Sequence, residues 1–375
     1  MSETPILATA ETPILAPSET PILALARKPQ VGLELTVEPT ALTTKGLGRA
    51  ELQVEIGPQR TPQRYTVEVR GVLPGERVRV RILRIKRRTL WAKTLELLSS
   101  DPRRGTPRCR HAGPIEEPGR GCGGCALQHV DHHTQLELKT HEVRRIFADQ
   151  GLDDALLRAS LAPREPWYYR NKMEYSFARG TNDSLCLGLH PPGYHHEVLP
   201  LTECHLLSPL TSKLLPALGR WANEAGLRAF EFAPGRGWLR TLTFREGKHT
   251  GERMLELCTT DAQEAMTAQG MRPAEEVARR FIQEAQEITQ KLGGELTSIY
   301  WTEQHTRRGE PTRLIEHLIA GAPTLAEELH LPAIASVSAA RTLHFEIHPR
   351  AFFQPNTFQA EVLYGEVLRA ALVEG

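Results

Sequence analysis

Glu76-Arg77-Val78-Arg79-Val80-Arg81-Ile82 alternates between basic and apolar side chains from Arg77 onward. In a β-strand successive side chains point to opposite faces, so the valines and the isoleucine share one face and the arginines share the other. Around this stretch, from Leu33 to about Leu98, short alternating runs are separated by Gly and Pro: LELTVE, AELQVEI, YTVEVRG, ERVRVRILRI and TLWAKTLEL. The pattern predicts a small β-barrel that displays Arg79 and Arg81 on its outer face.

Positive charge is concentrated in and beyond this predicted barrel. Between Arg70 and Arg110 the sequence holds thirteen Lys or Arg residues and three acids, an excess of ten positive charges, although the net charge of the chain is +1. A local excess of this size favours a polyanionic partner, of which nucleic acid is the main candidate. The alternative is a solvated basic face that has no partner.

The composition is that of a soluble globular protein with two or three domains. The chain has 375 residues, 40% of them hydrophobic and 24% charged, and it lacks the run of ~18 apolar residues that a membrane-spanning helix needs. It also lacks the basic start and apolar stretch of a secretory signal, so we expect a cytoplasmic protein. Near the N-terminus ETPILA occurs three times, from Glu3, Glu11 and Glu19. A proline in every copy predicts that residues 1–30 are a disordered tail.

The centre of the chain predicts a mixed α/β domain. Residues Leu136, Val143 and Phe147 recur at helical spacing, which predicts a helix from about Thr134 with one apolar stripe. Strand-like runs follow from about Tyr168 to Leu257, and a polar helix is expected from Pro273 to Leu292.

The end of the chain predicts one more helix. Asn356 and Gln359 have the spacing of a capping box. The residues after them have the pattern of an amphipathic helix, with apolar positions at Val362, Leu363, Val367, Leu368 and Leu372.

The chain contains six cysteines, four of which have the arrangement of a metal site. Cys122-Gly-Gly-Cys125 forms a tight turn, Cys109 precedes it, and Cys204 lies far downstream. A zinc ribbon normally has two CxxC pairs and this chain has one, yet spacing alone leaves zinc and an iron–sulfur cluster about equally favoured. Unconnected thiols are the remaining interpretation. Cys186 and Cys258 lie in apolar runs and are expected to be buried thiols without a catalytic role.

Further motifs accompany these cysteines. They are Cys122-Gly-Gly-Cys-Ala-Leu-Gln-His129, Gln135-Leu-Glu-Leu-Lys139, Tyr169-Arg-Asn-Lys-Met173, Leu187-Gly-Leu-His190 leading to Glu203-Cys204, and Phe352-Phe-Gln-Pro-Asn356 followed by Leu363-Tyr364. Together they resemble the motifs of the RNA 5-methyluridine (uracil-C5) methyltransferases, which include the RumA-like 23S rRNA enzymes. Upstream, Gly71-Val-Leu-Pro-Gly-Glu76 and the basic strands after it resemble a TRAM domain, an OB-like barrel that holds RNA. The resemblance covers about residues 33 to 375.

The resemblance implies a role for each motif. Cys109, Cys122, Cys125 and Cys204 would be the ligands of a [4Fe–4S] cluster, with extra residues around Pro114 to Gly119 lengthening the first spacing relative to the family. Gln354 would contact S-adenosylmethionine, or alternatively be a turn residue that caps the last helix. The residues Arg170, Asn171 and Lys172 would lie in the RNA groove, and the alternative for them is a strand-end ion pair.

The resemblance also implies a domain order. We expect a TRAM barrel over residues 31–100 and a central iron–sulfur and RNA-binding α/β domain over 101–345, of which about 134–160 packs on the catalytic domain. Residues 346–375 would be the start of a Rossmann-like S-adenosylmethionine-dependent domain. The Gly-rich loop, the DPPR-like segment and the catalytic cysteine of the family do not occur in this sequence, so we expect the catalytic residues beyond Gly375.

The function implied is methylation of uridine C5 in RNA, with 23S rRNA favoured over tRNA and the protein acting as a monomer. In the family a cysteine adds to C6 of the uridine, C5 then takes the methyl group of S-adenosylmethionine, and a base removes the C5 proton. Two alternatives stay open. The chain could be a self-sufficient RNA-binding module with a metal site, or an inactive fragment.

Overall fold

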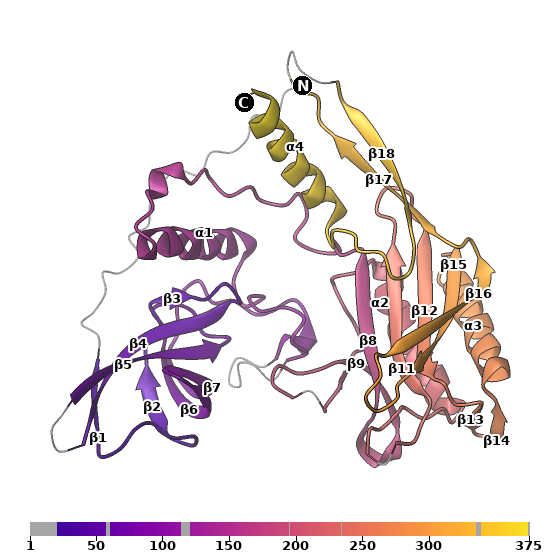
Figure 1. Ribbon diagram of the computed structural model, residues 1–375, viewed down its shortest axis with the longest axis horizontal. Helices are drawn as coiled ribbons and strands as arrows, with labels where there is room; N and C mark the ends of the chain where they lie inside the picture. Colours follow the sequence, from indigo (N-terminus) through magenta and orange to yellow (C-terminus); the bar gives the residue numbers. More distant parts are fainter. Residues whose placement is uncertain are drawn as a thin grey trace. The chain divides into compact units, whose positions relative to one another are not determined.

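A computed structural model describes residues 21–57, 61–113, 121–194, 196–233, 235–334 and 339–373. The chain folds into two compact units, and Figure 1 shows the course of the chain through each of them. In its described part the first unit comprises residues 21–106 and 129–159, and the second comprises 107–113, 121–128 and 160–373. Helices and several sheets occur together, so the predicted mixed α/β class is confirmed. The finer domain boundaries given above stay predictions.

The first unit contains a seven-stranded sheet with the order β1-β4-β5-β7-β6-β2, in which β3 pairs with β4. Its elements are β1 (Ile22–Leu25), β2 (Glu34–Val37), β3 (Ala41–Leu42), β4 (Leu47–Ile56), β5 (Thr61–Arg70), β6 (Arg77–Lys86), β7 (Thr89–Ser99), α1 (His132–Asp149) and the short 3-10 helix η2 (Asp154–Leu156). Along β6, Val78, Val80 and Ile82 are buried while Arg79 and Arg81 are exposed, which confirms the predicted alternation. Among the described strands β1 and β2 lie at the two ends of the strand order and do not pair with each other, so the sheet is not closed into a barrel there. The TRAM assignment stays a prediction.

Strand β1 corrects the prediction that residues 1–30 form a disordered tail. Ile22–Leu25, which includes part of the third ETPILA copy, pairs in parallel with β4, and residues 1–20 lie outside the described part. The backbone N–H of Gln53 donates to the Pro21 carbonyl at 3.0 Å, and that of Gly57 donates to the Leu25 carbonyl at 3.0 Å. Leu23 and Leu25 pack against the core of the sheet. The edge of β4 supplies hydrogen-bond partners for β1, and the core of the sheet supplies an apolar surface. The proline in each ETPILA copy gives no information about these partners.

A buried ion pair lies beside the start of β6. Glu76 is fully buried, and its carboxylate accepts from Arg104 Nε at 2.5 Å and from the Leu73 N–H at 2.8 Å. It also accepts from the Asp101 N–H at 3.2 Å. This single carboxylate therefore joins the turn before β6 to the segment that follows β7.

Helix α1 begins where the sequence predicted a helix, but it buries a different face. Asp131 caps the helix by accepting from the Thr134 N–H at 3.0 Å. Its buried residues are Thr134, Leu138 and Glu142, whereas Val143 is exposed, so the predicted stripe through Leu136, Val143 and Phe147 is wrong. Arg145 pairs with Glu142 at 2.7 Å, and this pairing compensates the burial of the Glu142 carboxylate. A search for apolar residues at helical spacing does not find such a buried position.

The second unit is built on a sheet with the order β10-β9-β8-β11-β12-β15-β16. Its elements are η1 (Arg110–Ala112), β8 (Lys172–Arg179), η3 (Thr181–Asp183), β9 (Leu185–Leu189), β10 (Leu199–Pro200), α2 (Pro209–Glu224), β11 (Leu239–Glu246), β12 (Arg253–Thr260), β13 (Glu264–Thr267), β14 (Gly270–Pro273), α3 (Ala274–Lys291), β15 (Ser298–His305), β16 (Arg313–Gly321), β17 (Leu325–Leu331), β18 (Arg341–Ile347) and α4 (Thr357–Val373). Neighbouring strands of this sheet are antiparallel except β12 and β15, which are parallel.

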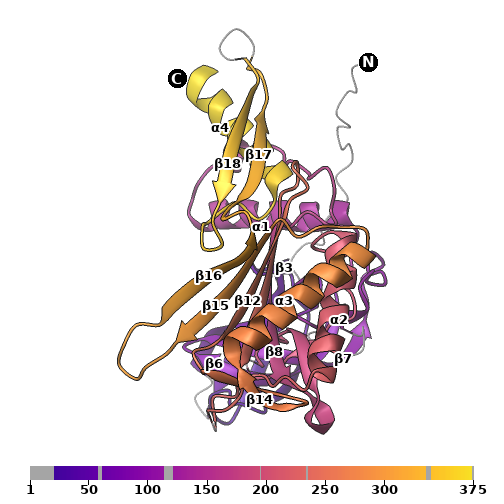
Figure 2. The same cartoon turned by 90° about the vertical axis from the view of Figure 1, so that its right-hand side faces the viewer.

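The two faces of this sheet differ in character. Helices α2 and α3 lie along one face, as Figure 2 shows, and the core there includes Tyr175, Phe244 and Phe281. On the opposite face Lys172, Arg245 and Glu256 are charged. Met254 of β12 and Tyr300 of β15 lie on that face too, where they pack with Leu325 and Ile347 in a smaller apolar cluster. The sheet thus has a mainly apolar face under α2 and α3, and an opposite face on which charged residues lie beside a smaller apolar cluster.

Helix α3 confirms the helix predicted between Pro273 and Leu292, but α2 falls within the region that the sequence predicted to be strand-like. Ser208 caps α2 by accepting from the Thr211 N–H at 3.3 Å, and Pro209 occupies its first turn. Leu214, Leu215 and Leu218 are fully buried against the sheet. Pro216 lies inside the helix, and a proline there argues against a helix when only the sequence is considered.

Beyond β16, the hairpin of β17 and β18 packs beside α4 in the same unit (Figure 1). The predicted cap of α4 is confirmed, because Asn356 Oδ1 accepts from the Gln359 N–H at 3.1 Å. Val362, Leu363, Val367 and Leu372 are exposed, so the predicted apolar face of α4 does not contact a core among the described residues. None of the described helices has both the length and the apolar character needed to cross a membrane.

Candidate metal centre and nucleic-acid contacts

The turn that carries Cys122 and Cys125 depends on small residues. A Cβ atom on Gly121 would lie 2.2 Å from the carbonyl oxygen of Ala112, and Gly123 has a φ of +76°. Only glycine meets both conditions without strain. The Cys122 N–H donates to the His111 carbonyl at 2.8 Å, which holds the turn against η1.

The other two cysteines of the set are held next to this turn. The Cys109 N–H donates to Gln128 Oε1 at 3.1 Å, and the Cys204 N–H donates to Ser212 Oγ of α2 at 2.9 Å. The Arg110 N–H donates to Glu203 Oε1 at 2.9 Å, which ties the segment of Cys109 to the segment of Cys204. All of these residues belong to the second unit.

The four predicted cysteines therefore converge, and all of them are free thiols. Burial raises the pKa of Cys109 to about 11, with further contributions from Cys122, Glu203 and Cys204. Burial also raises the pKa of Cys122, which is influenced by Cys125 and Cys204, and the pKa of Cys125, which is influenced by Cys204. Burial and the neighbouring thiols disfavour the thiolate form of each cysteine. A bound metal cation would stabilise these thiolates.

The spacing of these sulfurs bears on the kind of metal group that fits. Sulfurs bound to one zinc ion at about 2.3 Å lie only about 3.8 Å apart. Among the described residues the group whose ligand atoms all lie within 4.8 Å of one another is His249, His330 and Glu361, and the cysteines do not form such a group. Four thiols are a donor set that both zinc and iron–sulfur clusters use, so the kind of metal group stays a prediction.

Cys186 and Cys258 are buried, as the sequence predicted. Burial raises the pKa of each of these thiols to about 11. Both are thus disfavoured as thiolate nucleophiles at neutral pH.

The three residues of the Arg170-Asn171-Lys172 motif have different environments. Asn171 is buried, and its Nδ2 donates to the Gln354 carbonyl at 2.6 Å and to Thr357 Oγ1 at 3.1 Å. Its amide donors are used inside the protein, so its position does not support the predicted contact with RNA. The Arg170 Nε is buried without a hydrogen-bond partner in the described part of the chain.

Lys172 is half-buried on the face of the sheet opposite α2 and α3. Burial and then Arg245 lower its pKa, whereas Glu174 and Glu256 act in the opposite direction. Nearby, Arg350 pairs with Glu256 at 2.7 Å and with Glu316 at 2.8 Å. The environment of Lys172 is thus a network of mixed charge.

Gln354 lies in the segment between β18 and α4. Its carbonyl accepts from Asn171, and its side chain is half-buried. The next segment begins α4, so the alternative interpretation as a turn residue agrees with this position. The predicted contact with S-adenosylmethionine stays a prediction.

Arg79 and Arg81, which were predicted to bind RNA, pair with acids on neighbouring strands. Arg79 lies 2.9 Å from Glu96, and Arg81 lies 2.5 Å from Glu34. Their charges are therefore already compensated.

Unpaired positive charge lies instead at the turn between β6 and β7. Lys86, Arg87 and Arg88 are exposed and form no salt bridge with the described part of the chain, while Arg84 stacks over Trp91 at 5.1 Å. We call Lys86, Arg87 and Arg88 the hairpin tip. The sequence shows this feature as three consecutive basic residues between two predicted strands. The sequence-based prediction named only the alternating arginines Arg79 and Arg81.

A second contact of an arginine with aromatic rings lies beside the cysteines. Arg108 lies over Trp167 at 5.2 Å and over Tyr168 at 5.4 Å, and Tyr168 has a φ of 55°. The Tyr168 hydroxyl lies 2.9 Å from His205 Nδ1. No sequence pattern indicates this group, because Arg108 and Tyr168 meet only in the folded chain.

The chain is similar to proteins that are named as RNA methyltransferases. No protein-family model matches the sequence. A protein of Protochlamydia amoebophila named as an uncharacterised RNA methyltransferase is 31% identical over 306 residues, which cover 81% of this chain and 66% of that protein. A protein of the same name from Listeria innocua is 29% identical over 316 residues, which cover 84% of this chain and 62% of that protein. The chain is a homologue of proteins named as RNA methyltransferases.

The RNA methyltransferase homologues are longer than this chain, which spans less than two thirds of the length of these two relatives. A solved structure with a similar fold is the tRNA (uracil-54, C5)-methyltransferase of Pyrococcus abyssi in complex with S-adenosyl-L-homocysteine. It matches with a TM-score of 0.53 and 21% sequence identity, over 80% of this chain and 60% of that one. At this identity the likeness shows a shared fold.

Proposed function

We propose that this chain is the RNA-holding and iron–sulfur part of an S-adenosylmethionine-dependent methyltransferase that acts on C5 of uridine in RNA. The observation that carries the proposal is the convergence of Cys109, Cys122, Cys125 and Cys204 at one place in the second unit. These cysteines come from three separate segments of the chain. Their motif is the one that resembles the uracil-C5 enzymes, and the names of the homologues agree with that class.

The cysteines would hold a [4Fe–4S] cluster. Such a cluster, when bound, supplies a covalent link between the segments that carry its ligands. The link would join the Gly-rich turn of Cys122 to the segment before α2 that carries Cys204. Methyl transfer from S-adenosylmethionine requires no electron transfer to or from the cluster, so we assign the cluster a structural role.

The test of the cluster is anaerobic purification followed by iron, sulfide and zinc analysis. We expect iron and sulfide in equal amounts, and we expect Cys125→Ala to lose them and to lower the melting temperature. Cys186→Ala is the matched control, since Cys186 is a buried thiol outside the set. Zinc in place of iron, or an undiminished melting temperature in Cys125→Ala, would refute this part of the proposal.

The RNA would contact the first unit through the hairpin tip. Arg87 has a φ of 57°, a conformation that costs a residue with a side chain roughly 1–2 kcal/mol. Glycine would relieve this cost, so an arginine there suggests that its charge serves a purpose. The neighbouring stack of Arg84 on Trp91 is a surface on which an unpaired base can pack.

The choice of RNA is tested by binding and methylation. We propose 23S rRNA as the substrate and tRNA as the alternative, since the structure of similar fold is a tRNA enzyme. The chain is titrated with 23S rRNA fragments and with unmodified tRNA at equal salt, and the whole protein is assayed for transfer of labelled methyl from S-adenosylmethionine. Preferential binding and C5 labelling of 23S rRNA support the first choice, and preference for tRNA supports the second. Absence of RNA binding would overturn the proposal.

A further inference from the structure

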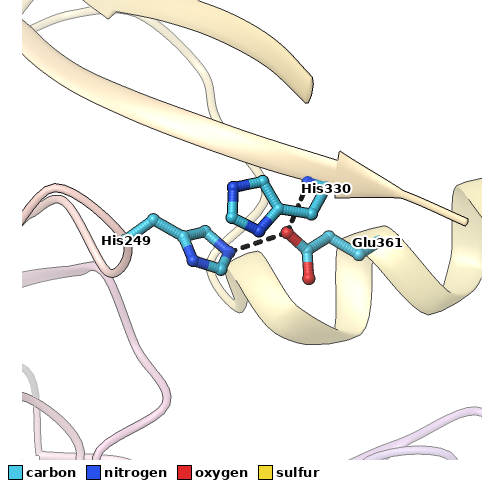
Figure 3. Close-up of side chains that lie close together, drawn as sticks. All are labelled: His249, His330 and Glu361. Atoms are coloured by element: carbon cyan, nitrogen blue, oxygen red, sulfur yellow. Dashed lines mark hydrogen bonds and ion pairs between the residues drawn. The ribbon is translucent and has the colours of Figure 1, made fainter. Parts of the chain in front are cut away.

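His249, His330 and Glu361 lie together although they come from three separate elements of the second unit. His249 belongs to the turn between β11 and β12, His330 to β17, and Glu361 to the second turn of α4. Their ligand atoms all lie within 4.8 Å of one another, and Figure 3 shows the two rings and the carboxylate facing a common point. None of the three residues lies in one of the sequence motifs described above.

The Glu361 carboxylate is the centre of the group. Its Oε1 lies 2.7 Å from His249 Nε2 and accepts from the His330 backbone N–H at 2.6 Å. The centroids of the two imidazole rings are 4.0 Å apart, with the ring planes tilted by 35°. Two imidazoles and one carboxylate at such separations are a donor set that transition-metal ions use in proteins.

A neighbouring carboxylate orients His330 for such a role. His330 Nε2 lies 3.0 Å from Glu328 Oε2, and an ionised carboxylate can only accept, so Nε2 carries the ring hydrogen. Nδ1 then keeps its lone pair, and Figure 3 shows this side of the ring turned toward Glu361. Histidines that bind a metal commonly donate their other ring N–H to a carboxylate in this way.

The backbone around the group is held by a second carboxylate, that of Glu327. Glu327 is 1% exposed, and it accepts from the Lys248 N–H at 2.7 Å and from the His249 N–H at 3.1 Å. It also accepts from Thr357 Oγ1 at 2.9 Å. Thr357 is four residues before Glu361, so both lie on one face of α4. The backbone segments that carry His249 and Glu361 are thus held in place before any ion binds.

We propose that His249, His330 and Glu361 bind one Zn²⁺ ion, independently of the cysteine site. The ion takes the place of the hydrogen on His249 Nε2, and that hydrogen moves to Nδ1 of the same neutral ring. Three protein ligands leave one coordination position for water on the side of His330, whose side chain is 48% exposed. The bound ion cross-links α4, β17 and the turn before β12.

The experiment uses the purified chain stripped with chelator and titrated with Co²⁺ and then Zn²⁺. A cobalt ion bound by imidazole and carboxylate gives weak d–d bands, whereas one bound by thiolates gives an intense near-ultraviolet charge-transfer band, so the two sites are read separately. We expect one equivalent of cobalt without thiolate bands, displaced by zinc, and slower hydrogen exchange in α4 when zinc is bound.

Variants decide whether the binding belongs to this group. His330→Ala and Glu361→Gln should abolish the imidazole-type signal, and Glu328→Gln should weaken binding by roughly 10- to 100-fold. His344→Ala is the matched control, because His344 is a 74% exposed histidine of the same hairpin that also approaches Glu328. Absence of thiolate-free cobalt binding, or binding unchanged in His330→Ala, would overturn the proposal.

Discussion

At the scale of single residues, buried carboxylates determine how segments are joined. In the first unit Glu76 is fully buried beside Arg104, whose side chain is 6% exposed. In the second unit Glu246 is buried and accepts from Ser208 Oγ at 2.6 Å and from Lys248 Nζ at 2.6 Å. The pKa of Glu246 is lowered overall, because Lys248, Ser208 and Thr211 outweigh the effect of burial. Each carboxylate replaces lost water with several donors, which is why it is tolerated inside.

The Glu76–Arg104 pair gives a first prediction. Glu76→Gln leaves the Arg104 guanidinium buried without its counter-charge, and removal of one partner of a buried pair costs about 3 to 5 kcal/mol. We expect a loss of that size in the free energy that protects β6 amides from hydrogen exchange. Glu96→Gln is the control, because it breaks the exposed pair with Arg79 and should cost about 1 kcal/mol or less. Equal losses in the two variants would contradict this account.

His129 gives a prediction about pH. Burial, with a smaller effect of Arg104, lowers its pKa from 6.5 to about 4. Because the folded pKa lies below the unfolded one, the neutral ring is required for folding, and stability is complete above pH 6.5 and declines as the pH falls toward 4. The linkage relation gives a loss of about 2 kcal/mol between pH 7 and pH 5.

The measurement is urea unfolding at the two pH values. In His129→Gln the part of the pH dependence that is due to this ring should disappear. His133→Gln, at a position whose side chain is 65% exposed, should keep the pH dependence of the parent chain. An identical pH dependence in the parent and in His129→Gln would show that the ring is not responsible.

At the scale of elements, the turn before Cys122 gives a third prediction. Gly121→Ala would place a Cβ atom 2.2 Å from the Ala112 carbonyl oxygen, so η1 or the cysteine turn has to move. Overpacking of this kind costs about 1–3 kcal/mol. We expect a lower melting temperature and a lower iron content after anaerobic purification. Gly105→Ala is the control, since nothing lies within 4 Å of its added Cβ.

The start of α4 gives a fourth prediction. Asn356→Ala removes the acceptor for the Gln359 N–H, and loss of such a cap costs about 1 kcal/mol. Hydrogen exchange in the first turn of α4 should accelerate about fivefold, which corresponds to that free energy. Asn356→Asp keeps a capping oxygen and should restore slow exchange. Fast exchange in the aspartate variant as well would show that the cap is not the cause.

At the scale of the whole molecule, the hairpin tip predicts how RNA binding depends on salt. Each phosphate contact on a single strand contributes about 0.7 to the slope of log K against log salt. Replacing Lys86, Arg87 and Arg88 by Gln should therefore reduce the slope by about 2 if all three contact phosphates. Arg279 and Arg280 of α3 serve as the control, and their replacement by Gln should leave the slope unchanged. If the slope is the same in the hairpin-tip variant and in the parent chain, the hairpin tip does not contact the RNA phosphates.

The two units also show how far residue patterns predict larger structure. Strict alternation in β6 was sufficient to predict its buried face, because a strand has only two faces. The face of α1 was predicted wrongly, because Glu142 is buried through its pairing with Arg145 and a hydrophobic pattern does not register a paired charge. Strand β1 was missed, because its order comes from the edge of β4 rather than from its own sequence.

Local sequence was sufficient to predict strands β2 and β4 to β7, helix α3 and the cap of α4, and to select four cysteines that lie together in the second unit. These depend on neighbouring residues, on periodicity or on motifs. Tertiary structure alone decided that Arg79 and Arg81 are paired, that Asn171 is buried, and that His249, His330 and Glu361 meet. The reason is physical: local patterns fix the direction of a side chain, whereas its partner comes from a segment that only folding brings within a few ångströms.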